Sequence, residues 1–459
     1  MEHTIAAIST PIGAGGISVI RISGISAFSI ASSMFKSKVS FDDIKSHTVT
    51  YGIIHDKEGN TVDHVLLLKM KAPKTYTKED TIEIHCHGGI YVTKKILALT
   101  YTNGAIPAQP GEFTKRAFIN GSIDLMEAEA VMDLINSEAE SSYKEAVSQL
   151  KGEKSIQIKS IRNELIDLIS HIMVIMDYPE YDVEKITVNQ AKEKASEITN
   201  KLRKLIEDFE NRRIIREGLN VAVIGDVNVG KSTFINRACG QNRVIVTDIA
   251  GTTRDVVEVK IDVKGLCVTL KDTAGIRSTD NEIEKIGIEK SKEAIEESDA
   301  VIYIADINRP YKDEMFNYIK DMDKAICVLN KTDLLLKEER DKHIEIMETE
   351  LKKIFKDRII ACSLDKLDKK EGINEIFDKL LEMVNKGNIG QKDSAITNER
   401  HKKHISDAIQ YLENTKEGSF IDMLSVDLTC AAEELGKITG ETATADIVDR
   451  IFEKFCIGK

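Results

Sequence analysis

The sequence predicts a multidomain protein that combines an N-terminal α+β domain, a discontinuous helical domain and an inserted α/β domain. Short β-like runs separated by Gly and Pro turns fill residues 1–120. A helical pattern of apolar residues follows over 121–217 and returns at 384–459. Between these stretches, strands alternate with helices over 218–383, which is typical of an α/β domain. Because helical segments flank the α/β segment, we expect them to pack into one domain.

The N-terminal region contains three short apolar runs. We expect strands at Ile17–Ile22, Val65–Leu68 and Thr81–Ile84. The last run is followed by a His-Cys-His triplet at 85–87, whose side chains are potential metal ligands. The position of the triplet between a strand and a Gly-Gly turn favours a packing or backbone role instead.

One long helix is expected before residue 180. Apolar side chains recur there at three- and four-residue steps, and a proline at 179 ends the run. The residues of this stripe are Ile161, Leu165, Leu168, Ile169, Ile172, Met173 and Met176.

Composition limits the possible classes of protein. The 459 residues suffice for roughly two to four domains. No apolar run approaches about 20 residues, so we expect no membrane-spanning helix. Seven irregularly spaced cysteines fit free thiols in a reducing cytoplasm, and no export signal is recognisable. The net charge of −12 gives no broad basic field, and the basic patches at 211–216 and 400–404 are better explained as solvated helix faces or linkers.

A phosphate-binding loop is indicated by Gly225-Asp-Val-Asn-Val-Gly-Lys-Ser232, which follows an apolar strand expected at Val221–Gly225. In such a loop the backbone N–H groups surround the β-phosphate. Lys231 reaches the β- and γ-oxygens, and the Ser232 hydroxyl binds Mg²⁺. A helix that begins near Lys231 adds its positive N-terminal end to the site.

Two further segments complete the predicted phosphate and metal site. The Gly-Thr-Thr-Arg-Asp segment at 251–255 contains Thr253, the expected second Mg²⁺ ligand, in a loop that responds to the γ-phosphate. Asp272 closes the strand expected at Cys267–Lys271 and can hold the metal through water. Gly275 can offer its N–H to the γ-phosphate.

The base is read by Asn330-Lys-Thr-Asp333, which follows the strand expected at Ala325–Leu329. The Asp333 carboxylate accepts hydrogen bonds from the guanine ring N–H and exocyclic amine, and adenine offers no such pair. Ser363 follows the apolar run 358–362, where a further base-contacting loop belongs, although Ser-Leu-Asp replaces the usual Ser-Ala-Lys. Together these segments predict a Ras-like P-loop domain that binds and hydrolyses GTP.

The residue after the Asp-Thr-Ala-Gly segment predicts an unusual route to hydrolysis. Ras-like GTPases carry a water-orienting Gln there, whereas this chain has Ile276. Asn228 in the phosphate loop offers an oxygen to a monovalent cation such as K⁺, which would take the charge role of an arginine finger. The acidic cluster Asp280–Glu284 is the other candidate, and a solvated loop is its alternative explanation.

Two other segments are too distinctive for packing alone, Pro110–Gly121 (PGEFTKRAFING) and Asp449–Lys459, which ends in Cys-Ile-Gly-Lys. Gly458 and Lys459 do not fit a prenylation signal around Cys456. Two explanations of Cys456 stay open, a small buried apolar residue and a nucleophilic thiol whose pKa Lys459 lowers.

With these segments in place, the chain resembles the MnmE (TrmE) family of tRNA-modification GTPases from end to end. The matching features are the opening His-Thr-Ile-Ala-Ala, Gly15-Gly16, Arg21-Ile-Ser-Gly24, Glu83 before His87-Gly-Gly89, the PGEFTKRAF stretch, Met176-Asp-Tyr-Pro-Glu180, the GTPase set and the Phe-Cys-Ile-Gly-Lys end.

The resemblance implies an N-terminal domain that binds tetrahydrofolate (methylene or formyl form) and dimerises, a discontinuous helical domain, and a K⁺-stimulated G domain. It also implies a heterotetramer with an FAD-dependent MnmG-type partner. The two proteins would add an aminomethyl or carboxymethylaminomethyl group to carbon 5 of the tRNA wobble uridine, with a folate one-carbon unit.

The resemblance also implies roles for individual residues. Glu284 would position the attacking water, and Ser232 and Thr253 would bind Mg²⁺. The implied K⁺ ligands, across which two G domains would meet, are Asn228, Thr247, Ile249 and Thr252. The implied nucleotide contacts are Asn228, Val229, Gly230, Lys231, Ser232, Thr233, Thr247, Asp248, Ile249, Ala250, Gly251, Thr252, Thr253, Asp272, Thr273, Ala274, Gly275, Asn330, Lys331, Asp333 and Ser363.

The implied folate site consists of Arg21, Glu83 and Lys459, with Cys456 beside the one-carbon unit. Glu83 would accept hydrogen bonds from the pterin, and Arg21 or Lys459 would pair with anionic or carbonyl groups. Ser122 stands where many relatives carry Lys, which weakens one contact to the glutamate tail of folate.

We therefore expect a cytoplasmic, dimeric GTPase that acts in wobble-uridine modification. Two alternatives stay open. A ribosome-assembly GTPase of the Era or Der type would carry a KH-type domain, of which no clear GXXG loop is present. A folate-dependent aminomethyltransferase with regulatory GTP would transfer the folate carbon to a small amine without tRNA.

Overall fold

The computed structural model describes residues 3–459, except for 178–187, 208, 242, 245–256, 273–291, 310–313, 320–321, 336–343, 346–348, 350, 353–354, 366–370, 385–396 and 417–420. The described chain divides into two compact units. The first unit consists of Met1–Met132, Gln149–Thr199 and Lys403–Lys459. The second unit consists of Asp133–Ser148 and Asn200–Lys402.

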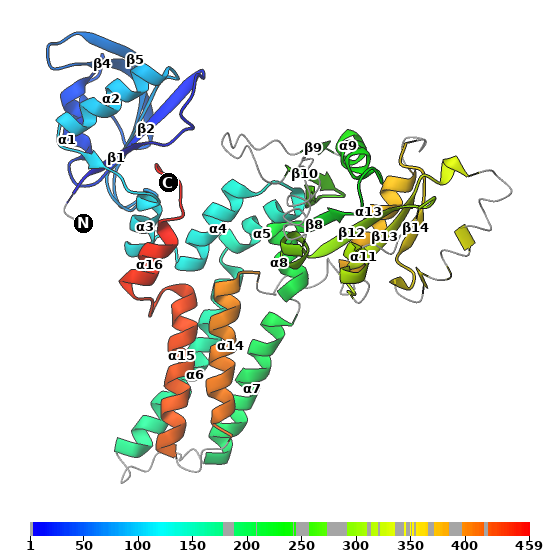
Figure 1. The fold of residues 1–459 in the computed structure, drawn as a ribbon. Helices are drawn as coiled ribbons and strands as arrows, with labels where there is room; N and C mark the ends of the chain where they lie inside the picture. The colour runs from blue at the N-terminus through cyan, green and yellow to red at the C-terminus, as the bar shows by residue number, and fades with distance from the viewer. Residues whose placement is uncertain are drawn as a thin grey trace. The chain divides into compact units, whose positions relative to one another are not determined.

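The N-terminal part of the first unit is a sheet with strand order β3-β4-β5-β6-β2-β1-β7 (Figure 1). Neighbouring strands run antiparallel except for the parallel pair β1 and β7. The strands are β1 (Ile5–Ile8), β2 (Ile17–Ser23), β3 (Phe35–Lys36), β4 (Thr48–His55), β5 (Thr61–Met70), β6 (Thr81–His87) and β7 (Ile106–Pro107). The strands expected from three apolar runs are confirmed as parts of β2, β5 and β6.

Two helices, α1 (Ala27–Met34) and α2 (Ile90–Thr102), share one core with this sheet. Ile82 and Ile84 of β6 enter that core, together with Ile96 of α2. Because side chains alternate along a strand, Glu83 points to the opposite face, beside its cross-strand neighbour Arg21 of β2. The predicted α+β character of this region is confirmed.

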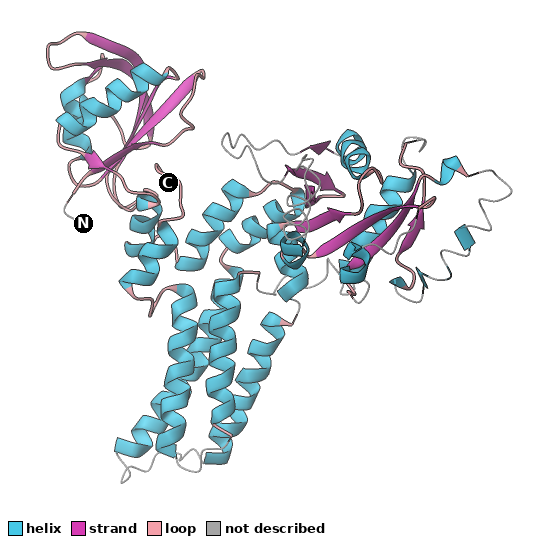
Figure 2. Cartoon of the chain, in the orientation of Figure 1, coloured by secondary structure: helices cyan, strands magenta, loops and turns pink. Residues whose placement is uncertain are grey.

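Long helices make up the rest of the first unit (Figure 2). The predicted helical stripe lies in α6 (Glu153–Asp177), which packs along α15 (Ile421–Thr439). Arg162 Nε of α6 donates to the Ala432 carbonyl of α15 at 3.1 Å. The other helices of this unit are α3 (Glu112–Ile119), α16 (Ala445–Phe452) and parts of α4 (Leu125–Asn136), α7 (Val188–Ile206) and α14 (Glu399–Asn414).

The second unit contains a sheet with strand order β14-β13-β12-β8-β11-β10-β9, in which β14 to β11 run parallel. The strands are β8 (Leu219–Ile224), β9 (Arg243–Val244), β10 (Val257–Val263), β11 (Leu266–Asp272), β12 (Ala300–Asp306), β13 (Ala325–Asn330) and β14 (Ile359–Ala361). The central strands β12 and β13 are buried throughout, as parallel strands covered on both faces must be.

Helices cover both faces of this second sheet. Phe234 of α9 (Lys231–Gln241) and Phe377 of α13 (Glu371–Val384) pack on one face, with ring centroids 6.0 Å apart. Phe316 of α11 (Glu314–Ile319) packs on the other. The unit also includes α5 (Glu140–Leu150), except its last residues, and α8 (Phe209–Glu217). The predicted α/β architecture, with strands at each expected run, is confirmed.

The two basic patches differ from the expected solvated faces. Arg213 pairs with Asp299, and Arg216 forms a double hydrogen bond with Asp133 at 2.8 Å. In the second patch, His401 is only 1% exposed, and Lys402 Nζ lies 4.1 Å from the centroid of the Phe209 ring. These charges stabilise the fold because acidic and aromatic partners lie within reach, a fact that local sequence does not reveal. Within the described residues, no helix has the length and apolar character needed to cross a membrane.

Candidate functional site

The phosphate loop connects β8 to α9 and depends on two glycines with positive φ. Gly225 has φ +143, and a Cβ there would lie 2.1 Å from the Ile304 carbonyl oxygen. Gly230 has φ +114, and its Cβ would lie 2.3 Å from Asn330 Nδ2. Any side chain at either position would therefore clash with the neighbouring strand or its following loop. The glycine spacing of the motif follows from these two close approaches.

Lys231, the first residue of α9, reaches back across this loop. Its Nζ donates to the carbonyl oxygens of Gly225 at 2.6 Å and Asp226 at 2.7 Å. Phosphate oxygens are stronger acceptors than these carbonyls, so a nucleotide would take over the ammonium group. Asn228, at φ +62, and Ser232 are both exposed beside it, where their oxygens can reach cations.

The base-reading segment and the phosphate loop are joined through Asn330. Asn330 Nδ2 donates to the Val229 carbonyl at 2.7 Å, and its Oδ1 accepts from the Leu364 N–H at 2.8 Å. The adjacent Ser363 hydroxyl donates to Asp333 Oδ1 at 2.7 Å. This hydrogen bond orients the carboxylate of Asp333 within the loop. The structure thus brings Asn330, Asp333 and Ser363 together.

Lys331 lies on the same loop in the left-handed conformation, at φ +67. Its Nζ is 2.9 Å from Asp306 Oδ2, at the end of β12. Burial raises the pKa of Asp306, but hydrogen bonds from Lys331 and Asn308 outweigh it, so the net pKa is lowered. The sequence analysis did not predict Asp306 as a site residue. Its position at the end of a strand that pairs with β13 could have indicated it.

Several predicted site residues lie outside the described residues or have undescribed side chains. Thr233 lies in the described helix α9. Asp272 is the last residue of β11, and its side chain lies outside the described part of the chain. Those outside the described ranges are Thr247, Asp248, Ile249, Ala250, Gly251, Thr252, Thr253, Thr273, Ala274, Gly275, Ile276 and the acidic cluster with Glu284.

A second cluster forms in the first unit, where Arg21 and Glu83 meet on neighbouring strands. Arg21 Nε donates to Glu83 Oε1 at 2.9 Å, and both side chains stay partly exposed. The C-terminal segment reaches the same place. Its Gly458 carbonyl accepts from Arg21 at 3.3 Å and from the Ser9 hydroxyl at 3.0 Å. The structure therefore brings Arg21, Glu83 and the segment of Cys456 and Lys459 together.

Ser122 is the predicted folate residue that does not join this cluster. It is exposed, and its backbone N–H donates to the Ala117 carbonyl at 2.7 Å. Among the described residues, no hydrogen bond joins it to Arg21 or Glu83.

Cys456 differs from the other cysteines because it is exposed. Burial raises the pKa of Cys267 to about 11 and the pKa values of Cys327 and Cys362 to about 12. Those thiols are protonated at neutral pH and are poor nucleophiles. The expected alternative of a buried Cys456 is wrong, since Gly458 and Phe455 take the buried positions instead.

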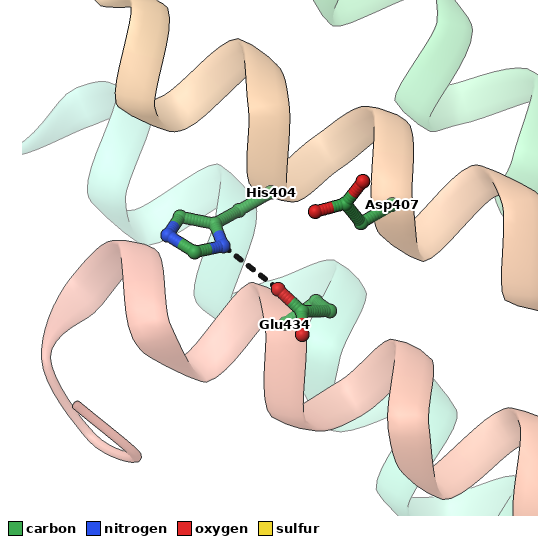
Figure 3. Close-up of side chains that lie close together, drawn as sticks. All are labelled: His404, Asp407 and Glu434. Atoms are coloured by element: carbon green, nitrogen blue, oxygen red, sulfur yellow. Dashed lines mark hydrogen bonds and ion pairs between the residues drawn. The ribbon is translucent and has the colours of Figure 1, made fainter. Parts of the chain in front are cut away.

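The side chains that could together ligate a metal ion do not belong to the His-Cys-His triplet. Cys86 is buried in the sheet core, and His87 pairs with Asp63 at 2.7 Å, which fits the expected packing role. In the described part of the chain, His404, Asp407 and Glu434 have potential ligand atoms within 4.8 Å of one another (Figure 3).

Glu434 is already committed within that group. It accepts from His404 Nδ1 at 2.7 Å and from Lys437 Nζ at 2.6 Å. The His404 contact joins α14 to α15, whereas Lys437 and Glu434 lie one turn apart on α15, so we interpret the group as an interhelical polar contact.

Known protein families and curated relatives match this chain along nearly its whole length. The family model described as the MnmE helical domain matches residues 125–456, and that described as the GTP-binding protein TrmE N-terminus matches residues 4–122. The tRNA modification GTPase MnmE of Acetivibrio thermocellus is 46% identical over 100% of this chain and 99% of its own length. The protein of that name from Clostridioides difficile is 42% identical over 100% of both chains. Among solved structures, an Era variant of Aquifex aeolicus bound to GDP and AlF4⁻ is 24% identical over 42% of this chain and 66% of its own, with a TM-score of 0.30, which is too low to carry an argument.

Proposed function

The chain belongs to the MnmE family of tRNA modification GTPases, and from this membership we propose that it modifies carbon 5 of the tRNA wobble uridine with a folate-derived carbon. It hydrolyses GTP in tRNA modification, with Mg²⁺ as the metal of the nucleotide site. The finer reaction would add an aminomethyl or carboxymethylaminomethyl group. An FAD-dependent MnmG-type partner would supply the redox chemistry.

The meeting of Arg21, Glu83 and the Cys456 segment is the observation that carries this proposal. Glu83 pairs with Arg21, yet its carboxylate has a second oxygen that can accept from a pterin N–H or amine. Cys456 is exposed two residues before Gly458, whose carbonyl accepts from Arg21, and a thiol there could serve as the nucleophile toward a one-carbon unit. Tetrahydrofolate, in the methylene or formyl form, is the cofactor that this chemistry favours.

We propose that K⁺ assists hydrolysis. Asn228 is exposed in the phosphate loop, at φ +62. Thr247, Ile249 and Thr252 would be the other K⁺ ligands, with Glu284 positioning the water. Ser232 and Thr253 would hold Mg²⁺.

We further propose a homodimer through the domain at 1–120, a helical domain made of 121–217 and 384–459, and a G domain at 218–383. Two such chains would bind two MnmG-type subunits and tRNA in the cytoplasm. The exposed apolar residues on the N-terminal sheet, Ile17 at 65% and Tyr51 at 63%, support the dimer.

Replacement of Cys456 by Ser tests the proposed function. Cells that carry Cys456→Ser instead of the native chain should lack the C5-modified wobble uridine, because the hydroxyl is a far weaker nucleophile than a thiolate. Mass spectrometry of tRNA nucleosides measures this loss, and the purified variant should hydrolyse GTP at the native rate. Normal amounts of the modified uridine would show that Cys456 takes no chemical part.

A further inference from the structure

The PGEFTKR segment lies directly against the C-terminal segment of the chain. The N–H of Gly111 donates to the Cys456 carbonyl at 3.3 Å, and the N–H of Phe113 donates to the main-chain oxygen of Lys459 at 3.2 Å. The first N–H groups of a helix have no partner within the helix. We define the tail as residues 453–459. Its carbonyl groups accept the hydrogen bonds of the Gly111 and Phe113 N–H groups at the start of α3.

Two glycines allow this close approach. Gly111 has φ +67, and a Cβ there would lie 2.8 Å from both the Phe452 carbonyl oxygen and Phe455 Cβ. Gly458 has φ +93, and its Cβ would lie 2.2 Å from the Ile8 carbonyl oxygen. The main chain at Phe452 and at Ile8 cannot move without disturbing the fold. A side chain at Gly111 or Gly458 would therefore push the tail away from the residues that it contacts.

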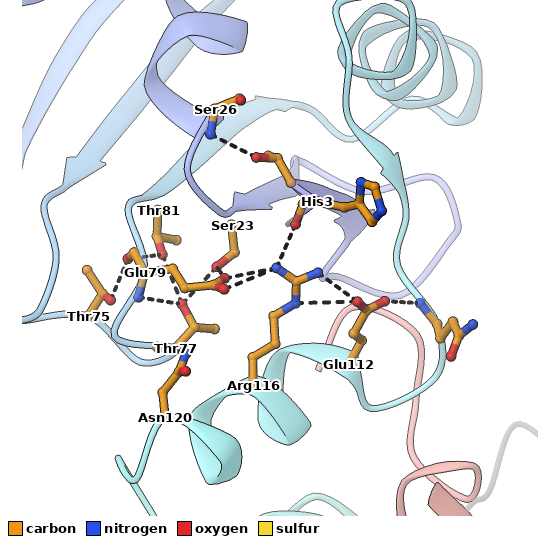
Figure 4. Close-up of polar contacts among 12 residues, drawn as sticks. His3, Ser23, Ser26, Thr75, Thr77, Glu79, Thr81, Glu112, Arg116 and Asn120 are labelled. Atoms are coloured by element: carbon orange, nitrogen blue, oxygen red, sulfur yellow. Dashed lines mark hydrogen bonds and ion pairs between the residues drawn. The ribbon is translucent and has the colours of Figure 1, made fainter. Parts of the chain in front are cut away.

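A buried arginine fixes α3 to the N-terminal sheet (Figure 4). Arg116 is 2% exposed, and its guanidinium pairs with Glu79 at 3.1 Å and with Glu112 at 2.8 Å. It also donates to the His3 carbonyl at 2.9 Å. Glu79 in turn accepts from the Ser23 hydroxyl at 2.8 Å. The guanidinium is thus held at several points, which a lysine ammonium could not match.

Glu112 links this arginine to the loop that carries Gly111. One of its oxygens pairs with Arg116, and the other accepts from the Gln109 N–H at 2.8 Å. The carboxylate therefore closes the turn 109–112 onto the same guanidinium. A contact chain runs from the sheet through Arg116 and Glu112 to the turn whose N–H groups hold the tail.

We propose that the segment Gly111–Arg116 is the positioning element for Cys456. The Cys456 carbonyl is held by Gly111 and by the Lys459 N–H at 3.4 Å, while its side chain is exposed. The main chain is fixed and the thiol is free, as a nucleophile requires. This inference rests on the proposed function of Cys456. It assigns to Arg116 and Glu112 an effect on tRNA modification without contact with tRNA or folate.

Hydrogen exchange in the full-length protein tests whether the segment holds the tail. Gly111→Ala should accelerate exchange on the order of tenfold in peptides covering 107–117 and 453–459, because the added methyl group breaks both main-chain hydrogen bonds. Gly59→Ala is the matched control. Gly59 also has positive φ, at +85, but its Cβ would meet nothing within 4 Å. Equal protection of the tail in Gly111→Ala and the native protein would overturn the proposal.

The same variants test the effect on function. Gly111→Ala should lower the C5-modified uridine in tRNA on the order of tenfold, while Gly59→Ala and the GTP hydrolysis rate stay native. A loosened tail with normal modified uridine would refute positioning. The exchange measurement contains no folate or tRNA, so it is independent of Cys456→Ser. Normal modification in Cys456→Ser would instead refute the proposed function.

The role of Arg116 must be tested in a variant that still folds. Arg116→Met alone leaves two partly buried carboxylates without their cation, so the triple variant Arg116→Met, Glu79→Gln, Glu112→Gln removes all three charges together. Its tail should exchange faster than the native tail, with the exchange of the β2–β6 sheet unchanged. Arg116→Lys should give an intermediate rate, because it keeps the charge without the fork geometry. If the tail of the triple variant exchanges at the native rate, Arg116 is not part of the positioning element.

Discussion

At the scale of residues, the base recognition that we propose for Asp333 depends on how its carboxylate is held. The Ser363 hydroxyl donates to one carboxylate oxygen, and Asn330 connects the same loop to the phosphate loop. The motif alone predicted Asp333 and Asn330, because their side-chain chemistry is specific to guanine. The contact between Ser363 and Asp333 spans 30 positions, so it needed the fold.

Asp333→Asn should change the preferred nucleotide from GTP to xanthosine triphosphate. The amide of Asn can donate to the xanthine carbonyl that replaces the guanine amine, whereas GTP loses one of its two acceptors and its amine then faces the NH2 group of Asn. We expect GTP affinity to fall on the order of a thousandfold. Titration of both nucleotides by calorimetry measures the change, and an unaltered GTP affinity would refute the assigned base contact.

The cysteines should differ sharply in reactivity. Raised pKa values keep the thiols of Cys267, Cys327 and Cys362 protonated at pH 8, because thiolate forms only as the pH approaches about 11 to 12. Exposed Cys456 should therefore be alkylated first by iodoacetamide. Peptide mass spectrometry over a time course identifies the modified sites. Denatured protein serves as the control, in which all cysteines should react; early alkylation of Cys327 in the native protein would contradict this order.

At the scale of elements, periodicity was sufficient for the long helices and buried strands. The stripe in α6 and the apolar runs of β8 and β13 are local patterns, so they appear in sequence. The two-residue strands β3 and β7 carry too few residues for a pattern. The contact between the tail and the start of α3 could not be predicted either. Its hydrogen bonds join main-chain atoms more than 340 positions apart, and main-chain atoms leave no side-chain signature.

The contact between α14 and α15 should make stability depend on pH. Burial raises the pKa of Glu434, but hydrogen bonds from Lys437 and His404 outweigh it, so the net pKa is lowered. The stabilisation is therefore present above the ordinary carboxyl pKa and is lost as the pH falls through the lowered value. Glu434→Gln should lower the free energy of unfolding by about 1 kcal/mol at pH 7.

Urea unfolding followed by the helix signal measures this difference, which should vanish in strong acid. Asp407→Asn is the matched control. Asp407 lies on the same helix pair and is half-buried, and no ion pair or hydrogen bond to it is present among the described residues. A loss at pH 7 as large for Asp407→Asn as for Glu434→Gln would show that the cluster acts through Asp407 and not through the Glu434 contacts.

At the scale of the whole molecule, the functions fall in separate units. The nucleotide motifs lie in the second unit, whereas Arg21, Glu83 and the tail lie in the first. The sequence order predicted this separation, because the GTPase segments are contiguous between helical stretches. If the cluster in the first unit is the modification site, as we propose, the nucleotide motifs and the modification chemistry belong to different units.

Hydrolysis should be much faster in K⁺ than in Na⁺, and the rate per chain in K⁺ should rise with protein concentration. Ile276 cannot orient water, and in our proposal a cation held by Asn228 supplies the missing charge, with paired G domains closing that cation off from solvent. Steady-state phosphate release in each salt, over a range of protein concentrations, measures both effects. Asn228→Ala should abolish the difference between the salts while it leaves GDP binding intact, because Lys231 and the loop N–H groups still hold the phosphates. Equal rates in K⁺ and Na⁺ for the native protein would exclude Asn228 as a cation ligand, and hydrolysis would then depend on the acidic segment alone.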